Sequence, residues 1–225
     1  MSWFEKYSET IIDSGYYELL LEGFGNTLLI TLGALAIGVV IGTIIAITKF
    51  FCEDVPALKP LYWLCDLYTT VIRGIPVVVL LLITFLVVFA SSDDGVTVAI
   101  ITFGINSGAY MAELIRGGIQ SVDAGQMEAG RSLGLSKLQT MTKIVFPQAI
   151  RYILPSIGNE MIALLKETSV AGYVAVRDLT KAGDQIRNNT YDAINPLLTV
   201  ALTYLALVVV MTAILSKVEK RLARK

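Results

Sequence analysis

Four long stretches of this chain contain no charged residue, and they limit the folds open to it. They cover residues 23–48, 74–92, 95–112 and 193–216, which are 26, 19, 18 and 24 residues long. A helix needs about 20 apolar residues to cross the hydrocarbon core of a bilayer. Only 16% of the residues are charged, against about 25% in a typical soluble domain. We therefore expect an all-α membrane protein with one helix in each stretch.

A fifth helix is expected over residues 148–171, where charged residues interrupt an apolar pattern. Five apolar residues lie at helical spacing: Ile153, Ile157, Met161, Leu164 and Leu165. Glu160, Lys166 and Glu167 fall within the same segment. Because charged side chains avoid lipid, one face of this helix should point into a helix bundle or a wet path.

Lys and Arg residues are distributed unevenly between the predicted loops. With the N-terminus outside, thirteen of them lie on the inner side, and the outer side holds Lys6, Arg177, Lys181 and Arg187. Positive charge concentrates on the cytoplasmic side of membrane proteins. We therefore predict five transmembrane helices, with the N-terminus outside and the C-terminus cytoplasmic. The expected divisions are an extracellular segment 1–22, one transmembrane domain 23–217 and a basic cytoplasmic tail 218–225.

The spacing of four glycines predicts close packing between helices. Gly38 and Gly42, like Gly104 and Gly108, are four residues apart, a spacing that lets helix backbones approach closely in lipid. The alternative is a chance recurrence in glycine-rich helices.

The chain has two cysteines and no histidine, which argues against a disulfide framework or a structural zinc site.

The longest polar stretch on the predicted inner side is 116–147, and its first part indicates a short helix. Asp123 is expected to cap this helix, with Gln126 reaching back to the cap. Gly134 suits the left-handed conformation that ends a helix. A turn at 121–147 is therefore expected to face the cytoplasm.

The second part of the stretch indicates another short helix. Ser136 and Gln139 have the spacing of a capping box, and Pro147 is expected to end the helix. The first helix would present Glu128–Gly130 as an exposed surface for a soluble partner. The chain lacks a phosphate-cradling GxxxxGK[ST] loop, so the energy source must be another chain.

At this point the sequence resembles a known signature. The residues are Glu128-Ala129-Gly130, then Gly134 after three residues, Ile144 after nine, and Phe146-Pro147 after one. This spacing resembles the EAA signature of permease subunits of bacterial ABC importers. Gly130 replaces the second Ala of that signature, and Phe146 replaces its Leu.

Further segments resemble the polar amino-acid branch of these permeases. They are Arg73-Gly74-Ile75-Pro76, Ala109–Glu113, Arg116–Ile119, Gly125-Gln126, Pro147-Gln148-Ala149, Leu154-Pro155, Asn159 and Lys166–Ser169. The resemblance covers residues 26 to 185. It implies a type I ABC importer permease core like that of the methionine importer, in a bacterial inner membrane, with no enzymatic activity of its own.

The resemblance also implies partners. Two permease subunits, identical or sibling, would form the pathway for a polar amino acid, and an extracellular solute-binding protein would deliver it. ABC ATPase subunits, which bind ATP and Mg, would dock on the cytoplasmic turn; no cofactor, metal or nucleic acid is expected on this chain. The predicted ATPase-coupling residues are Gln126, Glu128, Ala129, Gly130, Ser132, Leu133 and Gly134.

A second set of residues is predicted to line the substrate path: Asn106, Tyr110, Glu160, Lys166, Thr168 and Ser169. Glu160 falls near the bilayer midplane, where an acid either attracts a substrate cation or is satisfied by Asn106, Tyr110 or a neighbouring span. Lys166 either pairs with a substrate carboxylate or extends to the membrane surface. Arg73 is expected either to anchor its segment at the inner membrane surface or to form a salt bridge. The mixed charges of the predicted outer loop 171–195 either dock the binding protein or are simply solvated.

Other functions remain as alternatives. An ABC importer permease could serve a metal chelate, a sulfonate or a dipeptide, although the segments around Arg73 and Arg116 argue for amino acids. A standalone secondary carrier usually has more spans and internal repeats. An intramembrane enzyme would need clustered catalytic groups, and the chain has no histidine and no apparent aspartate dyad. The sequence leaves open which amino acid is carried and whether the dimer is homo- or heteromeric.

Overall fold

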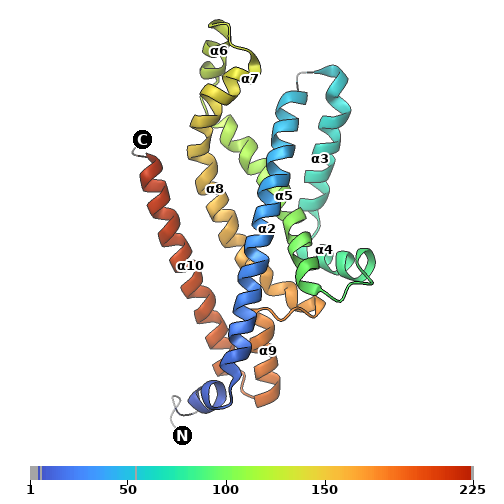
Figure 1. Cartoon of the computed structure of the whole chain (residues 1–225), viewed down its shortest axis with the longest axis vertical. Helices are drawn as coiled ribbons and strands as arrows, with labels where there is room; N and C mark the ends of the chain where they lie inside the picture. The colour runs from blue at the N-terminus through green and yellow to red at the C-terminus, as the bar shows by residue number, and fades with distance from the viewer. Residues whose placement is uncertain (1–4, 6, 54, 224–225) are drawn as a thin grey trace. The chain divides into compact units, whose positions relative to one another are not determined.

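The computed structural model describes residues 5, 7–53 and 55–223, and all regular secondary structure among these residues is helical (Figure 1). The α-helices in chain order are α2 (Tyr16–Cys52), α3 (Lys59–Gly74), α4 (Val77–Ile83), α5 (Gly95–Gln120), α6 (Ala124–Ser132), α7 (Lys137–Thr140), α8 (Phe146–Glu167), α9 (Leu179–Thr190) and α10 (Ile194–Ala223). Shorter π or 3-10 segments cover Ser8–Asp13, Pro56–Leu58, Thr84–Val88, Met141–Val145 and Thr168–Val174. The expectation of an all-α chain is confirmed over these residues.

Three of these helices are long and apolar enough to cross a membrane: Tyr16–Cys52, Gly95–Gln120 and Ile194–Leu222. A fourth crossing results if Pro56–Gly74 and Val77–Val88 count as one broken span. The first and third charge-free stretches, and the fourth from its second residue onward, therefore lie within helices of spanning length, as predicted. Helix α8 forms where the fifth helix was expected, with charged residues among its 22 positions.

The helix expected over 74–92 is shorter than predicted. Helical structure begins at Val77, after Pro76, and ends with the π turn at Val88. Twelve residues at 1.5 Å each extend about 18 Å, less than the roughly 30 Å of a bilayer core. Absence of charge sets the apolar length, but Pro76 and the turn from Phe89 onward decide how much of it is helical.

The chain divides into two compact units. Unit 1 comprises Met1–Ala36, Ile75–Gly104 and Ile162–Met211, and unit 2 comprises Ile37–Gly74, Ile105–Met161 and Thr212–Lys225. Helices α2, α5, α8 and α10 each contribute one part to each unit. The predicted single domain over 23–217 stays a prediction.

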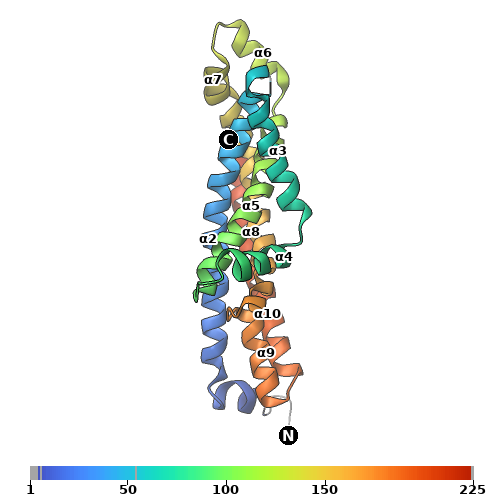
Figure 2. The same ribbon diagram turned by 90° about the vertical axis from the view of Figure 1, so that its right-hand side faces the viewer.

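Unit 1 has two apolar clusters. The larger is built from α2, α4, α5, α8 and the segment after α8, with Ile30, Leu81 and Phe103 fully buried. The smaller packs α9 against the first part of α2 and α10 (Figure 2). It buries Leu179 and Ile186. Unit 1 thus holds helix α9 through its own apolar core.

Unit 2 packs α2 closely against α5. A methyl group on Gly38 would lie 2.7 Å from the Ser107 Oγ, and one on Gly108 would lie 2.8 Å from the Ile41 Cγ2. A methyl group on Gly42 would collide with Met111. The close approach predicted from the spacing of Gly38 and Gly42 is confirmed, because only glycine leaves room for the facing helix.

Candidate functional site

The polar segment after α5 folds as two short helices in unit 2 (Figure 1). Asp123 caps α6 by accepting a hydrogen bond from the Gly125 backbone N–H. Gly134 adopts φ +84°, the left-handed conformation that glycine reaches without steric cost. Ser136 and Gln139 form a complete capping box at the start of α7. The local signals in the sequence therefore predicted this turn correctly.

Gln126 was expected to reach back to the cap at Asp123, and this expectation is wrong. Its side-chain oxygen instead accepts a hydrogen bond of 3.2 Å from the Gln148 Nε2. Asp123 caps α6 alone, and Gln126 ties α6 to the beginning of α8. A local capping rule cannot detect a partner that lies 22 residues further along the chain.

Pro147 does not end the second helix, contrary to the expectation. Helix α7 runs through the π turn Met141–Val145 directly into α8, and Phe146 has helical angles of φ −62° and ψ −41°. A proline lacks the N–H that an α-helix uses at each interior position. Here it follows a wide turn at the second position of α8, where the missing donor matters least.

Gly130 is buried, although the sequence placed it on an exposed surface. A side chain there would collide with Thr140 and would lie 3.1 Å from the Ile144 Cδ1. Gly130 is therefore the contact at which α6 packs on the second helix. This contact explains why glycine occupies the place of the second alanine in the EAA-like pattern.

The other predicted coupling residues face outward. Those exposed are Gln126, Glu128, Ala129, Ser132, Leu133 and Gly134. Leu133 is a large apolar residue, yet 81% of its surface is accessible. Arg131 donates a hydrogen bond to the Leu135 carbonyl and closes the turn. The segment thus presents a preformed, mainly polar surface from which the Leu133 side chain projects.

An ionic network that sequence reasoning missed joins α2, α3 and α5 within unit 2. The Lys49 Nζ lies 2.9 Å from an Asp66 oxygen and 3.1 Å from a Glu113 oxygen, although Lys49 is only 4% exposed. The Arg116 Nη2 donates to the other Glu113 oxygen at 2.6 Å. Lys49 and Glu113 each border a charge-free stretch, which is the one sequence signal that pointed to them.

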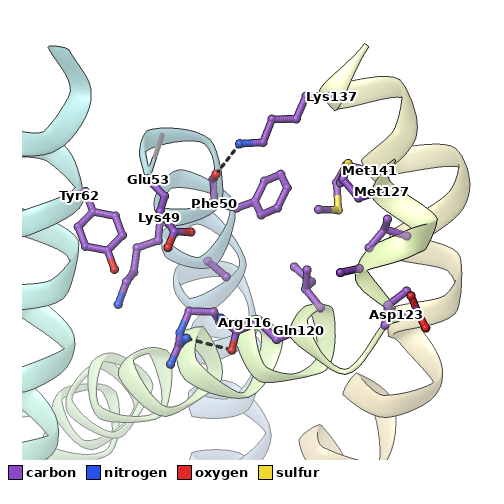
Figure 3. Close-up of a pocket in the computed structure, with 15 residues that line it drawn as sticks. Lys49, Phe50, Glu53, Tyr62, Arg116, Gln120, Asp123, Met127, Lys137 and Met141 are labelled. Carbon is purple, nitrogen blue, oxygen red and sulfur yellow. Dashed lines mark hydrogen bonds between the residues drawn. The ribbon is translucent and has the colours of Figure 1, made fainter. Parts of the chain in front are cut away.

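A hollow of about 390 Å³ lies beside this network in unit 2 (Figure 3). Its wall includes the ends of α2 and α5, part of α3, α6 and the π turn before α8. Lys137 of α7 donates a 3.4 Å hydrogen bond to the Phe50 carbonyl across it (Figure 3). The hollow therefore lies between the ends of long helices and the turn described above.

Three predicted path residues lie in unit 2. Asn106 is buried at 3% exposure, and the neighbouring Ser107 donates a 3.3 Å hydrogen bond to the Glu160 carboxylate. Tyr110 is half-buried, and the Arg73 guanidinium lies 5.2 Å from the centre of its ring. Glu160 thus has a protein partner on α5. Its role toward substrate stays a prediction.

The remaining path residues lie in unit 1. Lys166 is exposed and Ser169 is half-buried. Thr168 is fully buried and donates a 2.7 Å hydrogen bond to the Leu165 carbonyl. The backbone therefore already uses the Thr168 hydroxyl proton, which leaves its oxygen as an acceptor.

The segment 171–195, predicted to be an outer loop, makes more internal contacts within unit 1 than its charges suggested. Arg177 pairs with Glu22 at 2.6 Å, and its carbonyl accepts a hydrogen bond from Asn26. Asp178 is buried and caps α9 by accepting from the Thr180 and Lys181 backbone N–H groups. Burial raises the pKa of the Asp178 carboxyl above its ordinary value, although these hydrogen bonds oppose the rise. Asp178 is thus unavailable as a surface charge for docking.

The sequence of this chain is similar to those of known transport proteins. Residues 38–224 match the family described as "Binding-protein-dependent transport system inner membrane component". A probable glutamine ABC transporter permease from Bacillus subtilis (strain 168) is 37% identical over 92% of this chain and 95% of its own length. An arginine transport system permease from the same organism is 33% identical, over 90% and 92%. The glutamine transport system permease of Escherichia coli (strain K12) is 36% identical, over 91% and 93%.

Solved structures show the same likeness. One described as an amino acid ABC transporter with histidines is 38% identical, with a TM-score of 0.85 over 92% of this chain and 96% of that one. The MetNI methionine ABC transporter, in an inward-facing conformation, gives a TM-score of 0.79 at 22% identity, over 91% and 96%. The second comparison supports the fold alone.

Proposed function

This chain belongs to the family of binding-protein-dependent transport system inner membrane components, and we propose that it carries a polar amino acid into a bacterial cell. It is a permease subunit of an amino-acid ABC importer. The observation that carries the proposal is likeness to glutamine and arginine permeases along nine-tenths or more of the chain. The finer points of substrate, orientation and partners are proposals.

We propose that the exposed side of α6 docks a separate ATPase. The support is geometric: caps and a left-handed glycine hold the turn in one shape, while Glu128 and Leu133 point outward. A rigid helix joined to α5 and α8 can pass a partner's motion to those helices. ATP and Mg would be bound, and ATP hydrolysed, by that partner chain.

We propose five crossings of the inner membrane: α2, the broken pair α3 and α4, α5, α8 and α10. The N-terminus would be outside and the C-terminus cytoplasmic, as the distribution of Lys and Arg favours. In this arrangement α6 and α7 face the cytoplasm and α9 faces outward. A second permease copy or sibling and an extracellular binding protein complete the proposed assembly.

Within the membrane, Glu160 is the proposed substrate contact, with Asn106 and Tyr110 on the neighbouring helix. A carboxylate inside a membrane domain is costly, and its presence favours a functional role. The bond from Ser107 offers a purely structural alternative. The two roles predict different effects of substitution.

The test is ATPase activity of the complex in lipid nanodiscs, with its cognate ATPase and a binding protein loaded with each amino acid in turn. We expect stimulation by a polar amino acid. Glu160→Gln should change the order of preference among amino acids, whereas Ser107→Ala should leave that order intact. Equal effects of both variants would make Glu160 a structural partner of Ser107.

Two other outcomes would decide between broader alternatives. Stimulation only by a non-amino-acid solute would refute the substrate proposal and leave the importer family standing. Transport by the purified chain without any ATPase would favour a secondary carrier instead.

A further inference from the structure

The hollow beside the Lys49 network is distinct from the proposed substrate path. Its volume of about 390 Å³ falls within the range of small-molecule sites, roughly 300–1,000 Å³. Asn106, Tyr110 and Glu160 are absent from its wall. Nothing in the proposed import cycle accounts for a cavity at this position.

One part of the hollow has polar groups with unused bonding capacity. Arg116 has five N–H donors, and three of them are used on Glu113 and Gln120. Among the described residues, the Glu53 carboxylate and the Tyr62 hydroxyl make no hydrogen bond. Figure 3 shows these three side chains, from α5, the end of α2 and α3, around the hollow. A cationic donor, an anionic acceptor and a hydroxyl therefore border one space.

Another part of the hollow is apolar and is lined by two methionines. Met127 from α6 and Met141 from the π turn contribute to its wall (Figure 3). Val145 of the same π turn also lines it. Methionine side chains adapt to partners of different shape. This surface suits the side chain of a small amphipathic ligand.

The charges nearby disfavour a strongly anionic ligand. Asp66 and Glu113 already neutralise Lys49 and Arg116. The other charged groups on the wall are two carboxylates and one ammonium group, those of Glu53, Asp123 and Lys137, so the balance is negative. A phosphate group would need uncompensated positive charge. A ligand with one carboxylate and one ammonium group satisfies the site better.

We propose that this hollow binds a free zwitterionic amino acid on the side of the coupling turn. The α-carboxylate would accept from Arg116, the α-ammonium would donate to Glu53, and the side chain would lie against Met127 and Met141. The proposal rests on the proposed function, because an amino-acid importer releases such a molecule on that side. It adds a site that senses the released product.

A bound amino acid would join two parts of unit 2. Glu53, Tyr62 and Arg116 belong to the ends of long helices, whereas Met127 and Met141 belong to the coupling turn and its continuation. Ligand contacts to both would resist movement of α6 relative to α2 and α5. Accumulated product would then slow ATP hydrolysis that the loaded binding protein stimulates.

The experiment measures this slowing in the complete complex in nanodiscs, with binding protein saturated with its own amino acid. Free L-glutamine, L-arginine and L-methionine are then added in excess, beside glutaminamide, which lacks the α-carboxylate. We expect at least one amino acid to inhibit and glutaminamide to be inactive. Glu53→Gln should weaken inhibition at least tenfold, because it removes the charged acceptor of the hydrogen bond from the α-ammonium group. Inhibition is normalised to the rate of each variant without free amino acid.

Two further variants make the outcome decisive. Glu219→Gln removes one carboxylate from α10, outside the wall of the hollow, and should leave the inhibition constant unchanged. Met127→Cys, in a chain with Cys52→Ala and Cys65→Ser, should react more slowly with a maleimide when the inhibiting amino acid is present, a readout independent of ATP turnover.

Absence of inhibition by all three amino acids, or equal inhibition of wild type and Glu53→Gln, would overturn this site. Neither result affects the proposed function, which has its own test: stimulation of the ATPase by an amino-acid-loaded binding protein.

Discussion

Helices α6 and α9 are both short, polar and capped by an aspartate, yet they are held in different ways. Helix α9 buries Leu179, Ala182, Gly183 and Ile186 within unit 1. Helix α6 buries only Gly130 within unit 2. The first is stabilised by an apolar core. The second depends on its caps, on a left-handed glycine and on one close contact with the following helix.

This difference indicates which of the two helices has a surface left over to bind another molecule. An amphipathic helix that buries one face gains stability from that burial. A helix that buries almost nothing keeps its surface for another molecule, and its shape must come from local chemistry. We therefore expect substitutions in α9 to act on stability, and substitutions on the outer side of α6 to act on assembly and coupling.

The largest expected effect is that of Gly134→Pro. Proline fixes φ near −65°, whereas Gly134 requires φ +84°, so the turn between α6 and α7 cannot form. We expect the loaded binding protein no longer to stimulate the ATPase. The spans should remain folded, which a melting temperature close to that of the wild type in detergent would show. Gly134→Asn is the matched control, because asparagine tolerates the left-handed region and should retain most stimulation. Normal stimulation of the proline variant would show that the shape of this turn is not needed.

Next comes Ile186→Ala, which tests the core under α9. Ile186 is fully buried, and such truncations cost about 2–5 kcal/mol. For a chain of this length the melting temperature should fall by on the order of 10 °C. The measurement is thermal unfolding of the purified chain in detergent. If the melting temperature fell no further than it does when an exposed leucine is replaced by alanine, α9 would not be stabilised by its core in the way that separates it from α6.

Leu133→Ala should give the opposite pattern on α6. Because Leu133 is 81% exposed, its truncation should change the free energy of unfolding by less than about 0.5 kcal/mol. Burying a leucine in a partner contributes about 1.5–3 kcal/mol, so the affinity for the ATPase should fall about tenfold. Titration of labelled ATPase onto nanodisc-bound permease measures this. Unchanged affinity would place the docking surface elsewhere.

Much of this architecture could be predicted because its causes are local. Absence of charge over 23–48 identified α2, and the residue types at Asp123, Gly134 and Ser136 placed the turn. The glycine spacing at Gly38 and Gly42 predicted close helix packing. In each case the residue and its physical effect lie within a few positions of each other.

The features that sequence reasoning missed depend on distant partners. Gln126 bonds to Gln148, and Lys49 is buried because Asp66 and Glu113 meet it from two other helices. Gly130 is buried by Thr140 across a turn. Asp178 looked like one more charge of an outer loop, but burial changes its chemistry.

Asp178 provides the smallest effect that still separates α9 from α6. Burial raises the pKa of its carboxyl in the folded state, so the folded chain retains a proton over a range where the unfolded chain has lost it. Stability from this group should therefore fall as pH rises from the ordinary aspartate value to the raised one, and stay level above it. The substitution Asp178→Asn keeps a capping oxygen but removes the titratable group. The difference in melting temperature between wild type and this variant should thus change across that acidic window, and a constant difference would mean that the buried cap carries no proton-linked cost.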